Sequence, residues 1–443
     1  MNSVEPTAGP GPQTILDAWP DLVDHRTGIV RELAELRIDD DDPPFVHYLS
    51  YACSTEAWGF LPNFGNNGGV GANVRTAIAK ALGEAVERYC SALVRYDDLV
   101  WSAYDRLDEP ATSPASFALY RPEQYASAGF PWQPFTTDAP VAWTRGRSLV
   151  SGRPVLVPAA FVYVPYHYLR DRPDTPIAQP ISTGLACGPS PEDATLAALC
   201  EVVERDAFTL MWQARLVRPR IRPGSLPGEF ADLVDRYAAV GLTVHLVDIT
   251  TDVACPTVLA VAEGFVPTSP AIAVAAASFP DPVVAARKSL EELAHTRKFA
   301  AQVMDYLPPV PVEVEAGHPA VDGQRAHLRF YCPQEAKAVA SFAWSGVREI
   351  DLAEQRSCRP SVDALVAEVA ASGEDVIACD LTTPDVAELG LAVVRVVVPG
   401  FHPLHMGHAN RCLGGRRLAT LPLMAGVEDW SPARDNPYPH PFP

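Results

Sequence analysis

The sequence has no hydrophobic run that approaches the ~20 residues needed to cross a bilayer as a helix. Its N-terminus also lacks the basic stretch followed by an apolar stretch that marks a secretory signal peptide. We therefore expect a cytoplasmic protein. With 443 residues, of which 48% are hydrophobic and 20% charged, the chain is long enough and apolar enough to bury large cores.

Positively charged residues are fewer than negatively charged ones. The chain has 35 lysine and arginine residues against 54 aspartate and glutamate residues, and its formal net charge is −19. A surface of this sign repels the phosphates of nucleic acids and of anionic lipids. We therefore expect neither a nucleic acid nor a membrane as partner, whereas a neutral or basic peptide remains compatible.

Paired cysteines are also missing. The nine cysteines are scattered, and none forms a C-x-x-C motif. Cys200 and Cys379 lie inside apolar segments. This pattern is typical of reduced thiols in a cytosolic protein, and it argues against a cysteine-bound structural zinc.

Residues 194–212 are the most informative stretch that the sequence does contain. Read as a helix, the segment is apolar on nearly every side, which is typical of a buried helix. It nevertheless carries Glu201 and Glu204 on one face, followed by Arg205. Buried carboxylates need compensation. Either arginines from elsewhere pair with them at the rim of the core, or they hold Mg²⁺ together with phosphate oxygens.

The same E-x-x-E-R spacing occurs a second time. Glu84, Glu87 and Arg88 lie within residues 77–89, which also fit a helix. Alone, this segment would be a surface helix with an ordinary Glu84–Arg88 pair. Two helices with the same triplet favour one site that both of them line.

A third helix is predicted over residues 283–299. Lys288, Glu292 and His295 share one of its faces, whereas Glu291 points elsewhere and is expected to be solvated. The alternative is an ordinary Lys288–Glu292 pair on an exposed helix.

Two α/β modules are predicted near residues 220–300 and 340–420. Each has a helix, a glycine and then two strands, and the sequence DITT at Asp248 matches DLTT at Asp380. We expect both aspartates to be turn or cap residues. The pattern predicts an α+β fold with pseudo-symmetric α/β modules, in which mixed sheets carry helices on one face.

Several segments of the sequence resemble the YcaO family. ISTGLACGPSPEDATLAALCEVVERDA (residues 181–207) resembles its hallmark segment, GGVGANVRTAIAKALGEAVERYC (68–90) its first nucleotide-site motif, and SLEEL (289–293) its third. LVDHRTGIV (22–30) and the C-terminal NPYPHPFP resemble the azoline-forming branch, the SagD-like cyclodehydratases of peptide natural-product pathways. The resemblance covers most of the chain.

The resemblance implies a YcaO-type fold, ATP and Mg²⁺ as cofactors, and a ribosomally synthesised precursor peptide as substrate. In that branch, a Cys, Ser or Thr side chain attacks the preceding carbonyl, and the oxyanion takes the γ-phosphate of ATP. Phosphate then leaves, which gives a thiazoline or an oxazoline. Phosphoryl transfer of this kind needs positioning and charge neutralisation more than covalent chemistry.

The resemblance also assigns ligands, residue by residue. The matching metal positions are Glu84, Glu87, Glu201, Glu204 and Glu292, and the matching nucleotide positions are Arg88, Ser182 and Arg205. To these we add three candidate nucleotide contacts that accompany the matched carboxylates, namely Lys80, Lys288 and His295.

Four positions depart from the family pattern. Lys80 replaces a common serine, Val70 the lysine of a GKG motif, Thr183 an asparagine and His295 a glutamine. Every carboxylate is retained, so the departures concern nucleotide geometry more than metal binding. They leave open a non-catalytic docking or scaffold subunit of the same complex.

The C-terminal tail, residues 431–443, has proline at every second position from Pro437 onward, which predicts a polyproline II segment. A disordered end is the alternative. In the cyclodehydratases that the chain resembles, a similar tail reaches the active site and supports cyclisation. This resemblance makes Pro439, Pro441, Phe442 and Pro443 candidate catalytic residues, and it argues against thioamide or amidine formation, the runner-up chemistries.

His402, His405 and His408 recur every third residue. Pro403 and Gly407 interrupt any helix that would place them on one face. The spacing therefore does not favour a histidine-bound metal.

The remaining segments complete the organisation. Residues 1–13 are predicted to be flexible, residues 63–73 a glycine-rich loop suited to close approach of a phosphate, and residues 105–138 an excursion from a catalytic domain over residues 14–430. No E1-like segment is visible before Thr14, so we expect a separate E1-like (ThiF-like) protein to bind the leader of the precursor. A flavin azoline dehydrogenase is a further expected partner, and a homodimer is left open.

Overall fold

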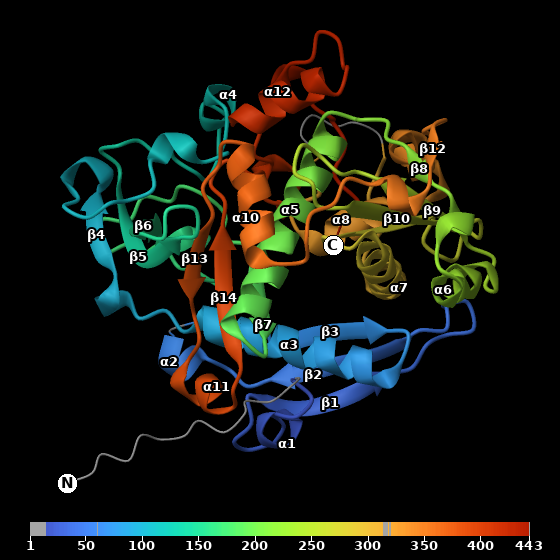
Figure 1. The fold of residues 1–443 in the computed structure, drawn as a ribbon, viewed down its shortest axis with the longest axis horizontal. Coiled ribbons are helices and arrows are strands. Elements are labelled where there is room, and N and C mark those ends of the chain that lie inside the picture. Colours follow the sequence, from blue (N-terminus) through green and yellow to red (C-terminus); the bar gives the residue numbers. More distant parts are fainter. Residues whose placement is uncertain (1–14, 60, 313–317, 319, 443) are drawn as a thin grey trace.

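The computed structural model describes residues 15–59, 61–312, 318 and 320–442. The predicted flexible segment 1–13 and Pro443 lie outside the described residues. The fold belongs to the α+β class that the sequence predicts, with three β-sheets around three long helices (Figure 1).

The three sheets are built almost entirely from antiparallel pairs, and β8 and β12 form a parallel pair. The three-stranded sheet contains β1 (Val30–Leu36), β2 (Val46–Ala52) and β3 (Asn66–Gly71). The five-stranded sheet has the order β11 (Ile272–Ser278), β10 (Thr257–Glu263), β9 (Thr243–Asp248), β8 (Arg220–Ile221) and β12 (Glu349–Ile350). The six-stranded sheet has the order β4 (Val100–Ala103), β5 (Pro140–Ser148), β13 (Ile377–Asp380), β14 (Ala392–Val397) and β7 (Leu185–Gly188), with β6 (Pro154–Pro158) paired to β5.

The three acidic segments form the long helices α3 (Val74–Ala92), α5 (Pro191–Gln213) and α7 (Pro282–Tyr306), each longer than the predicted range. Each begins at a side chain that accepts a hydrogen bond from the first turn. The capping residues are Asn73, Ser190 and Asp281. The shorter helices are α1 (Trp19–Leu22), α2 (Glu56–Gly59), α4 (Pro122–Tyr125), α6 (Gly228–Ala238), α8 (Gln324–Phe330), α9 (Lys337–Ala340), α10 (Val362–Ala371), α11 (Pro384–Glu388) and α12 (Arg416–Met424).

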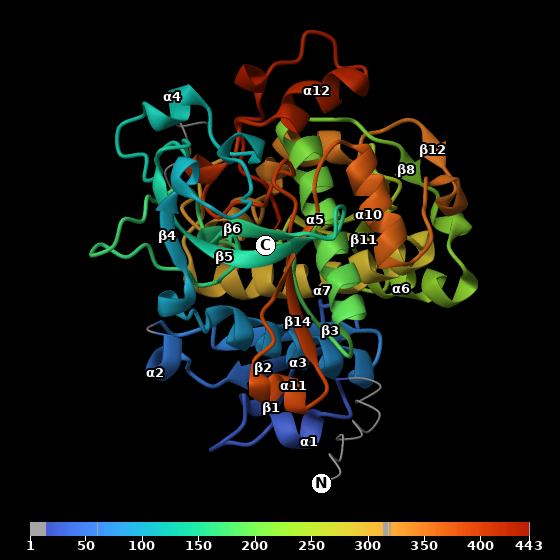
Figure 2. The same cartoon turned by 60° about the vertical axis from the view of Figure 1, so that its left-hand side comes forward.

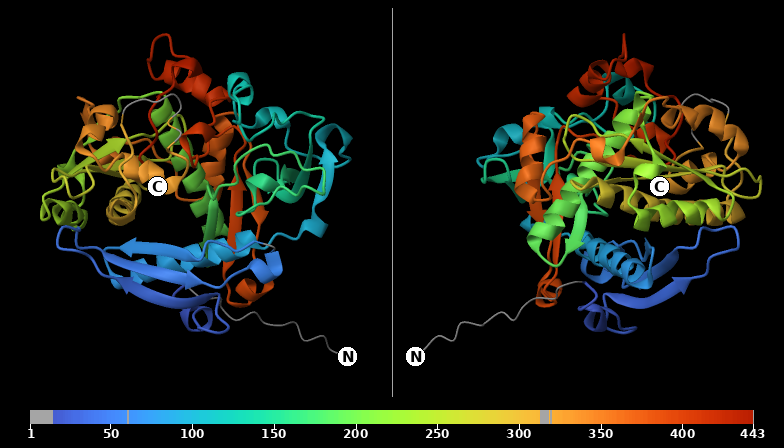
Figure 3. Two further views of the ribbon diagram at one scale, coloured as in Figure 1. Left: turned by 180° about the vertical axis from the view of Figure 1, so that it is seen from behind. Right: turned by 45° about the vertical axis from the view of Figure 1, so that its right-hand side comes forward.

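Each long helix packs between two sheets. Helix α3 contacts β2 and β3 on one side and β7 on the other, and α5 contacts β7 and β14 as well as β10 and β11. Helix α7 contacts β10 and β11 and also β3, and Figure 3 shows it between the five-stranded and the three-stranded sheets. Helices and sheets therefore alternate, which brings the three acidic segments next to one another.

Strand β11 shows why the five-stranded sheet is apolar throughout. Ala273 and Ala275 pack with the core of α7, whereas Ile272 and Val274 pack with Trp212 and its neighbours on α5. A sheet that is buried on both faces needs a continuous apolar run rather than an alternating one. The helices thus cover both faces of this sheet, one more layer than the arrangement predicted from the sequence.

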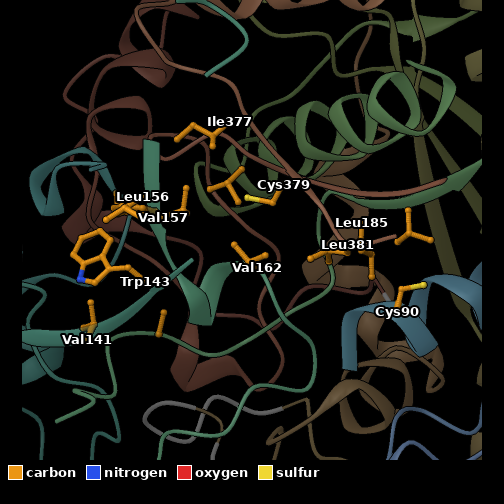
Figure 4. Packing of buried hydrophobic residues seen from close by; sticks show 14 of the residues in the cluster. Cys90, Val141, Trp143, Leu156, Val157, Val162, Leu185, Ile377, Cys379 and Leu381 are labelled. Carbon is orange, nitrogen blue, oxygen red and sulfur yellow. The ribbon is translucent and has the colours of Figure 1, made fainter. Parts of the chain in front are cut away.

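The six-stranded sheet covers a large apolar cluster, part of which Figure 4 shows around Trp143, Leu156 and Ile377. The predicted excursion, residues 105–138, contains short helical turns but no strand. It contributes Phe117 and Phe135 to this same cluster. The segment is therefore part of the core.

The glycine-rich residues 63–73 were expected to form a loop, and this expectation is wrong for most of them. They contain strand β3, which pairs with β2. The glycines serve close packing, because a Cβ on Gly69 would lie 2.1 Å from the carbonyl oxygen of Ala77 on α3. Composition alone did not distinguish a glycine-rich strand under a helix from a loop.

The two predicted α/β segments share a local order. Helix α6 leads to β9 and β10, and α10 leads to β13 and β14. The carboxylates of Asp248 and Asp380 accept hydrogen bonds from the backbone N–H groups of Thr250 and Thr382, at 3.0 and 2.9 Å. Both aspartates are turn residues, as expected.

Two other sequence expectations concern the whole chain. No helix in the described ranges is both long and apolar enough to cross a membrane. All nine cysteines are free thiols.

A buried ion pair joins α5 to α12, a helix that Figure 2 shows beyond one end of α5. Arg417 Nη2 lies 2.7 Å from Asp206 Oδ2 and 2.7 Å from Asp252 Oδ1, and the Asp206 side chain has no exposed surface. Burial opposes ionisation of Asp206, but Arg417 outweighs it and lowers the pKa of this carboxyl. The charge of Asp206 depends on that guanidinium.

We predict that Arg417→Ala lowers the free energy of unfolding by about 3–5 kcal/mol, because it leaves a buried carboxylate without a countercharge. The neighbouring Arg416 pairs with Glu374 at an exposed position and provides a matched control. Arg416→Ala should cost no more than about 1 kcal/mol. Urea unfolding monitored by tryptophan fluorescence measures both, and equal losses in the two variants would contradict the prediction.

Candidate functional site

The carboxylates of α3 are held by backbone groups of neighbouring strands. Glu84 Oε2 accepts a hydrogen bond from the N–H of Gly68 on β3 at 2.9 Å. Glu87 Oε1 accepts one from the N–H of Cys187 on β7 at 3.0 Å. Both side chains are therefore fixed in place before any ligand binds.

The second triplet, on α5, compensates its charges only in part. Arg205 lies 3.7 Å from Glu201 and 3.4 Å from Glu204. The contacts come from the same helix, whereas one interpretation of the sequence expected arginines from elsewhere to pair with these glutamates.

Electrostatic effects link the first two helices. Burial raises the pKa of Glu87 to about 8, and the negative charges of Glu201 and Glu84 add to the shift against the opposing effect of Arg88. A carboxyl group that is hard to ionise in the presence of these neighbours favours a cation that all of them share.

Glu204 extends this network to α7. Burial raises its pKa to about 8, and Glu201 and Glu292 contribute to the increase while Arg205 and Lys288 oppose it. The three helices thus present the predicted carboxylates to one region. They are Glu84, Glu87, Glu201, Glu204 and Glu292.

Lys80 of α3 and Glu292 of α7 form a direct ion pair, with Nζ 2.7 Å from Oε1. Burial opposes ionisation of Glu292, but Lys80, followed by His295 and Lys288, outweighs it and lowers the pKa of the carboxyl. Lys80 was expected to contact phosphate, and in this structure its ammonium group contacts carboxylates.

The expectation for Glu291 is wrong. Its side chain was expected to be solvated, but the residue is only 2% exposed. Its carboxylate accepts a hydrogen bond from Ala72 N–H at 3.3 Å and lies 3.0 Å from Lys80 Nζ. The helical pattern separates Glu291 from the face of Lys288 and Glu292, but Lys80 of α3 and the backbone at Ala72, both distant in the sequence, cover its carboxylate.

His295 packs directly over β3. A Cβ on Gly68 would lie 2.4 Å from Cε1 of this imidazole, so the ring could not occupy its present position beside a larger residue. The glycine that donates to Glu84 therefore also positions His295.

The sequence analysis missed one charged residue of the site, Arg395 on β14. Its side chain donates from Nη2 to the carbonyl oxygen of Ile181 at 2.8 Å, beside Ser182, and its Nε and Nη1 hydrogen-bond to no described residue. Burial lowers its pKa to about 10, with Glu201 opposing and Arg88 adding to the shift. The sequence did contain an indication of this residue, because Arg395 lies within the otherwise apolar run VVRVVV. A charged residue is rarely buried in such a strand unless it is paired.

Arg395 also lines a largely apolar cavity. Ile181, Thr183 and Val202 line this cavity, and so does the segment from Phe117 to Tyr120. The carboxylate cluster therefore adjoins a cavity whose lining includes Arg395, two of whose guanidinium nitrogens hydrogen-bond to no described residue.

The C-terminal tail returns to the site along α5. Its Phe442 is 4% exposed, and the ring centroid lies 4.4 Å from the guanidinium carbon of Arg205 and 4.6 Å from the ring of Phe208. Cation–π contact of this kind holds an arginine in a fixed orientation. Pro439 and Pro441 lead to this contact.

Hydrogen bonds hold the tail before it reaches Phe442. Asn436 Nδ2 donates to the carbonyl oxygen of Trp212, and the Trp212 indole donates to the carbonyl oxygen of Tyr438, both at 3.2 Å. The Tyr331 hydroxyl donates to the carbonyl oxygen of Pro439. The tail is therefore a fixed part of the fold up to Phe442.

The residues present fit a nucleotide with Mg²⁺. Carboxylate oxygens are ligands that Mg²⁺ accepts, and it completes its shell with phosphate oxygens and water. Arg88 Nη1 is buried and hydrogen-bonds to no described residue, which leaves a donor for phosphate.

Proteins of two organisms are similar to parts of this chain. An uncharacterised protein of Methanothermobacter thermautotrophicus is 29% identical over 343 residues, which cover 75% of this chain and 80% of that protein. An uncharacterised protein in the tfuA 3′ region of Rhizobium leguminosarum bv. trifolii is 35% identical over 171 residues, 36% of this chain and 39% of that protein.

Solved structures share the fold. A heterocyclase in complex with substrate and cofactor superposes with a TM-score of 0.78 at 24% identity, over 96% of this chain. This chain spans 56% of that heterocyclase, so it matches little more than half of the larger protein. YcaO from Methanopyrus kandleri bound with AMPPCP and Mg²⁺ gives 0.62 at 21% identity, over 84% of this chain and 86% of that one. The E. coli microcin synthetase McbBCD complex with pro-MccB17 bound gives 0.60 at 14% identity, over 95% and 98%.

A family model described as YcaO cyclodehydratase, ATP- and Mg²⁺-binding, matches residues 68–402. This range contains all three acidic helices and Arg395. Together with the fold, the match shows that this chain is a member of the YcaO family and binds ATP and Mg²⁺.

Proposed function

We propose that this protein is an ATP- and Mg²⁺-dependent cyclodehydratase that converts Cys, Ser or Thr residues of a ribosomally synthesised precursor peptide to thiazolines or oxazolines. The observation that carries the proposal is the meeting of three acidic helices at one site, with the C-terminal Phe442 packed on Arg205 of that site. We place this activity in the cytoplasm, where thiols such as the nine free cysteines stay reduced.

The proposed roles follow the geometry. The glutamates of α3 and α5, with Glu292 of α7, would hold Mg²⁺, which would neutralise the phosphates. Arg88, Arg205 and Ser182 would contact the phosphates, and Lys288 and His295 would border them from α7. Lys80 would balance Glu292, because the two already form an ion pair.

We place the peptide bond that reacts in the cavity beside Arg395. The side chain of the substrate residue attacks the carbonyl carbon of the preceding residue and releases its thiol or hydroxyl proton to solvent. The resulting oxyanion takes the γ-phosphoryl group, which releases ADP. Loss of phosphate and of the amide proton then forms the ring C=N bond. The unpaired donors of Arg395 suit the oxyanion, since preorganised donors stabilise charge as it develops.

Partners are part of the proposal. The structures with a similar fold include a synthetase complex with its pro-peptide bound. By analogy, we propose that a separate E1-like protein delivers the leader of the precursor, and that a flavin azoline dehydrogenase acts on the product. A homodimer is a further assembly open to test.

A docking subunit without catalysis is the second candidate. It is favoured by the ion pair between Lys80 and Glu292, because this pair engages a carboxylate that is proposed as a metal ligand. The two candidates differ in ATP consumption, since only the enzyme hydrolyses ATP when peptide and partner are present.

The decisive experiment incubates the protein with ATP, Mg²⁺, the E1-like partner and a precursor peptide. We expect ADP release together with the loss of one water mass per ring by mass spectrometry. Loss of a water mass also separates azoline formation from thioamide formation, in which sulfur replaces oxygen. Peptide binding without ADP release would instead support the docking subunit.

Glu201→Gln should abolish detectable binding of the Mg²⁺–nucleotide complex and turnover, because it removes a central carboxylate. Glu192→Gln is a matched control at an exposed position on the same helix and should behave as wild type. Isothermal titration with a non-hydrolysable ATP analogue measures the affinity. Unchanged affinity in Glu201→Gln would remove this residue from the metal shell.

Removal of residues 439–443 should reduce cyclisation by about 10²-fold, because Arg205 loses the ring that orients it and the reacting groups are misplaced. Nucleotide affinity should change far less, since the carboxylates remain. Single-turnover cyclisation and nucleotide titration separate the two effects. A truncated protein that cyclises at the wild-type rate would exclude a catalytic role for Pro439, Pro441, Phe442 and Pro443.

Affinity for Mg²⁺ in the presence of nucleotide should rise as the pH is raised from 6 to 9. Glu87 and Glu204, with pKa values of about 8, hold protons at neutral pH that the metal must displace. Binding at pH 7 should therefore release protons, which titration calorimetry in buffers of different ionisation enthalpy detects. Glu204→Gln should release fewer protons than wild type, and pH-independent affinity would show that these carboxyls do not bind the metal.

A further inference from the structure

Three buried histidines from three segments meet where the tail passes α8. They are His327 on α8, His405 in the loop after β14, and His440 in the tail, and their exposed fractions are 0%, 2% and 1%. One ring nitrogen of each lies within 4.8 Å of those of the other two. The carboxylate site contains none of these three side chains.

The hydrogen bonds of the cluster fix which nitrogens carry lone pairs. His327 Nδ1 donates to the carbonyl oxygen of His440, and His440 Nε2 donates to the carbonyl oxygen of His405, both at 2.8 Å. A carbonyl oxygen only accepts, so in the neutral rings the lone pairs lie on His327 Nε2 and His440 Nδ1. A ring N–H donated to a backbone carbonyl is the usual arrangement of a metal-binding histidine.

Two of the rings have unmet bonding capacity. His440 Nδ1 and both ring nitrogens of His405 hydrogen-bond to no described residue. Buried polar atoms without partners are uncommon and call for a physical explanation. His327 Nε2 accepts only a 3.2 Å hydrogen bond from the N–H of Gly407.

All three imidazoles are neutral at physiological pH. Burial lowers the pKa of His327 to about 4 and holds the pKa of His405 and His440 well below the usual range. Neutral imidazole is the form that binds metals, so no proton has to be removed first.

We propose that His327, His405 and His440 bind one divalent transition-metal ion of the Zn²⁺ class, at a site distinct from the Mg²⁺–nucleotide site. Imidazole nitrogen suits Zn²⁺ and its neighbours in the transition series, whereas Mg²⁺ requires oxygen ligands. Three histidines leave the fourth position of a tetrahedral ion to water or to an incoming donor.

Binding requires a small rearrangement of the rings. Zn–N bonds of about 2.0 Å place tetrahedral ligand nitrogens about 3.3 Å apart, closer than the 4.8 Å limit of the present cluster. The rings of His327 and His440 are stacked, with centroids 4.0 Å apart. A bound ion lies near the plane of each imidazole that ligates it, so one of the two rings has to turn. Arg411, whose charge acts on His405, is paired with Asp435 at 2.8 Å, which weakens its repulsion of an ion.

The ion would tie the tail to two other elements. His440 lies two residues before Phe442, whose ring contacts Arg205 of the nucleotide site. Metal binding at the three histidines would therefore hold the tail in its docked position. This site is argued from the histidines alone and does not depend on the proposed cyclodehydration.

Co²⁺ is the probe for the test. The full-length protein, freed of metals by a chelator, is titrated with Co²⁺ in excess Mg²⁺, which occupies the carboxylates. We expect one equivalent to bind with the intense visible absorption of a low-coordinate, nitrogen-ligated ion, and Zn²⁺ to displace it. Absence of this absorption in wild-type protein overturns the proposal, whatever the variants do.

Variants identify the ligands. His405→Gln and His440→Gln should each weaken Co²⁺ binding at least about tenfold, whereas His167→Gln, at an exposed histidine, should not. Zn²⁺ should also slow hydrogen exchange in the C-terminal peptide of wild-type protein. Unchanged Co²⁺ affinity in both variants, or exchange that Zn²⁺ does not affect, would show that the ion binds elsewhere.

Discussion

The constraint on which the rest of this structure depends is the partial burial of carboxylates that also repel one another. Glu87 and Glu204 are hard to ionise in their surroundings, and Glu201 acts on both. Such a cluster costs stability unless the fold holds it rigidly for a cation. Backbone N–H groups of Gly68 and Cys187 provide part of that support, because each donates to one of the α3 glutamates.

The alternation of sheets and helices provides the remaining support. Each acidic helix packs between two sheets, so none of the three can shift without disturbing two layers. This arrangement explains why glycines occur in strand β3 rather than in a loop. Gly69 lets α3 approach, and Gly68 leaves room for the imidazole of His295. The glycines that allow close packing around the site thus also determine where its side chains lie.

Much of this organisation could be predicted from the sequence, since it depends on local periodicity. The three helices, the α+β class and the turn aspartates Asp248 and Asp380 follow from spacing and composition. The errors have a common physical origin in long-range contacts. Glu291 is buried by elements distant in the sequence, and the charge of Glu201 acts on Arg395 because β14 packs on α5. The repeated E-x-x-E-R spacing was informative because it suggested one such contact without requiring knowledge of the fold.

The distance in sequence between contacting groups has a consequence for biosynthesis. Lys80 and its partner Glu292 are 212 residues apart in the sequence, and Trp212 and Asn436, whose side chain donates to the Trp212 carbonyl oxygen, are 224 residues apart. The part of α5 around Trp212 therefore stays incompletely covered in a nascent chain until the segment at Asn436 has been translated. Non-local contacts of this kind form late during folding, and apolar surface stays exposed until they form. We therefore expect the newly made protein to depend on chaperones to avoid aggregation.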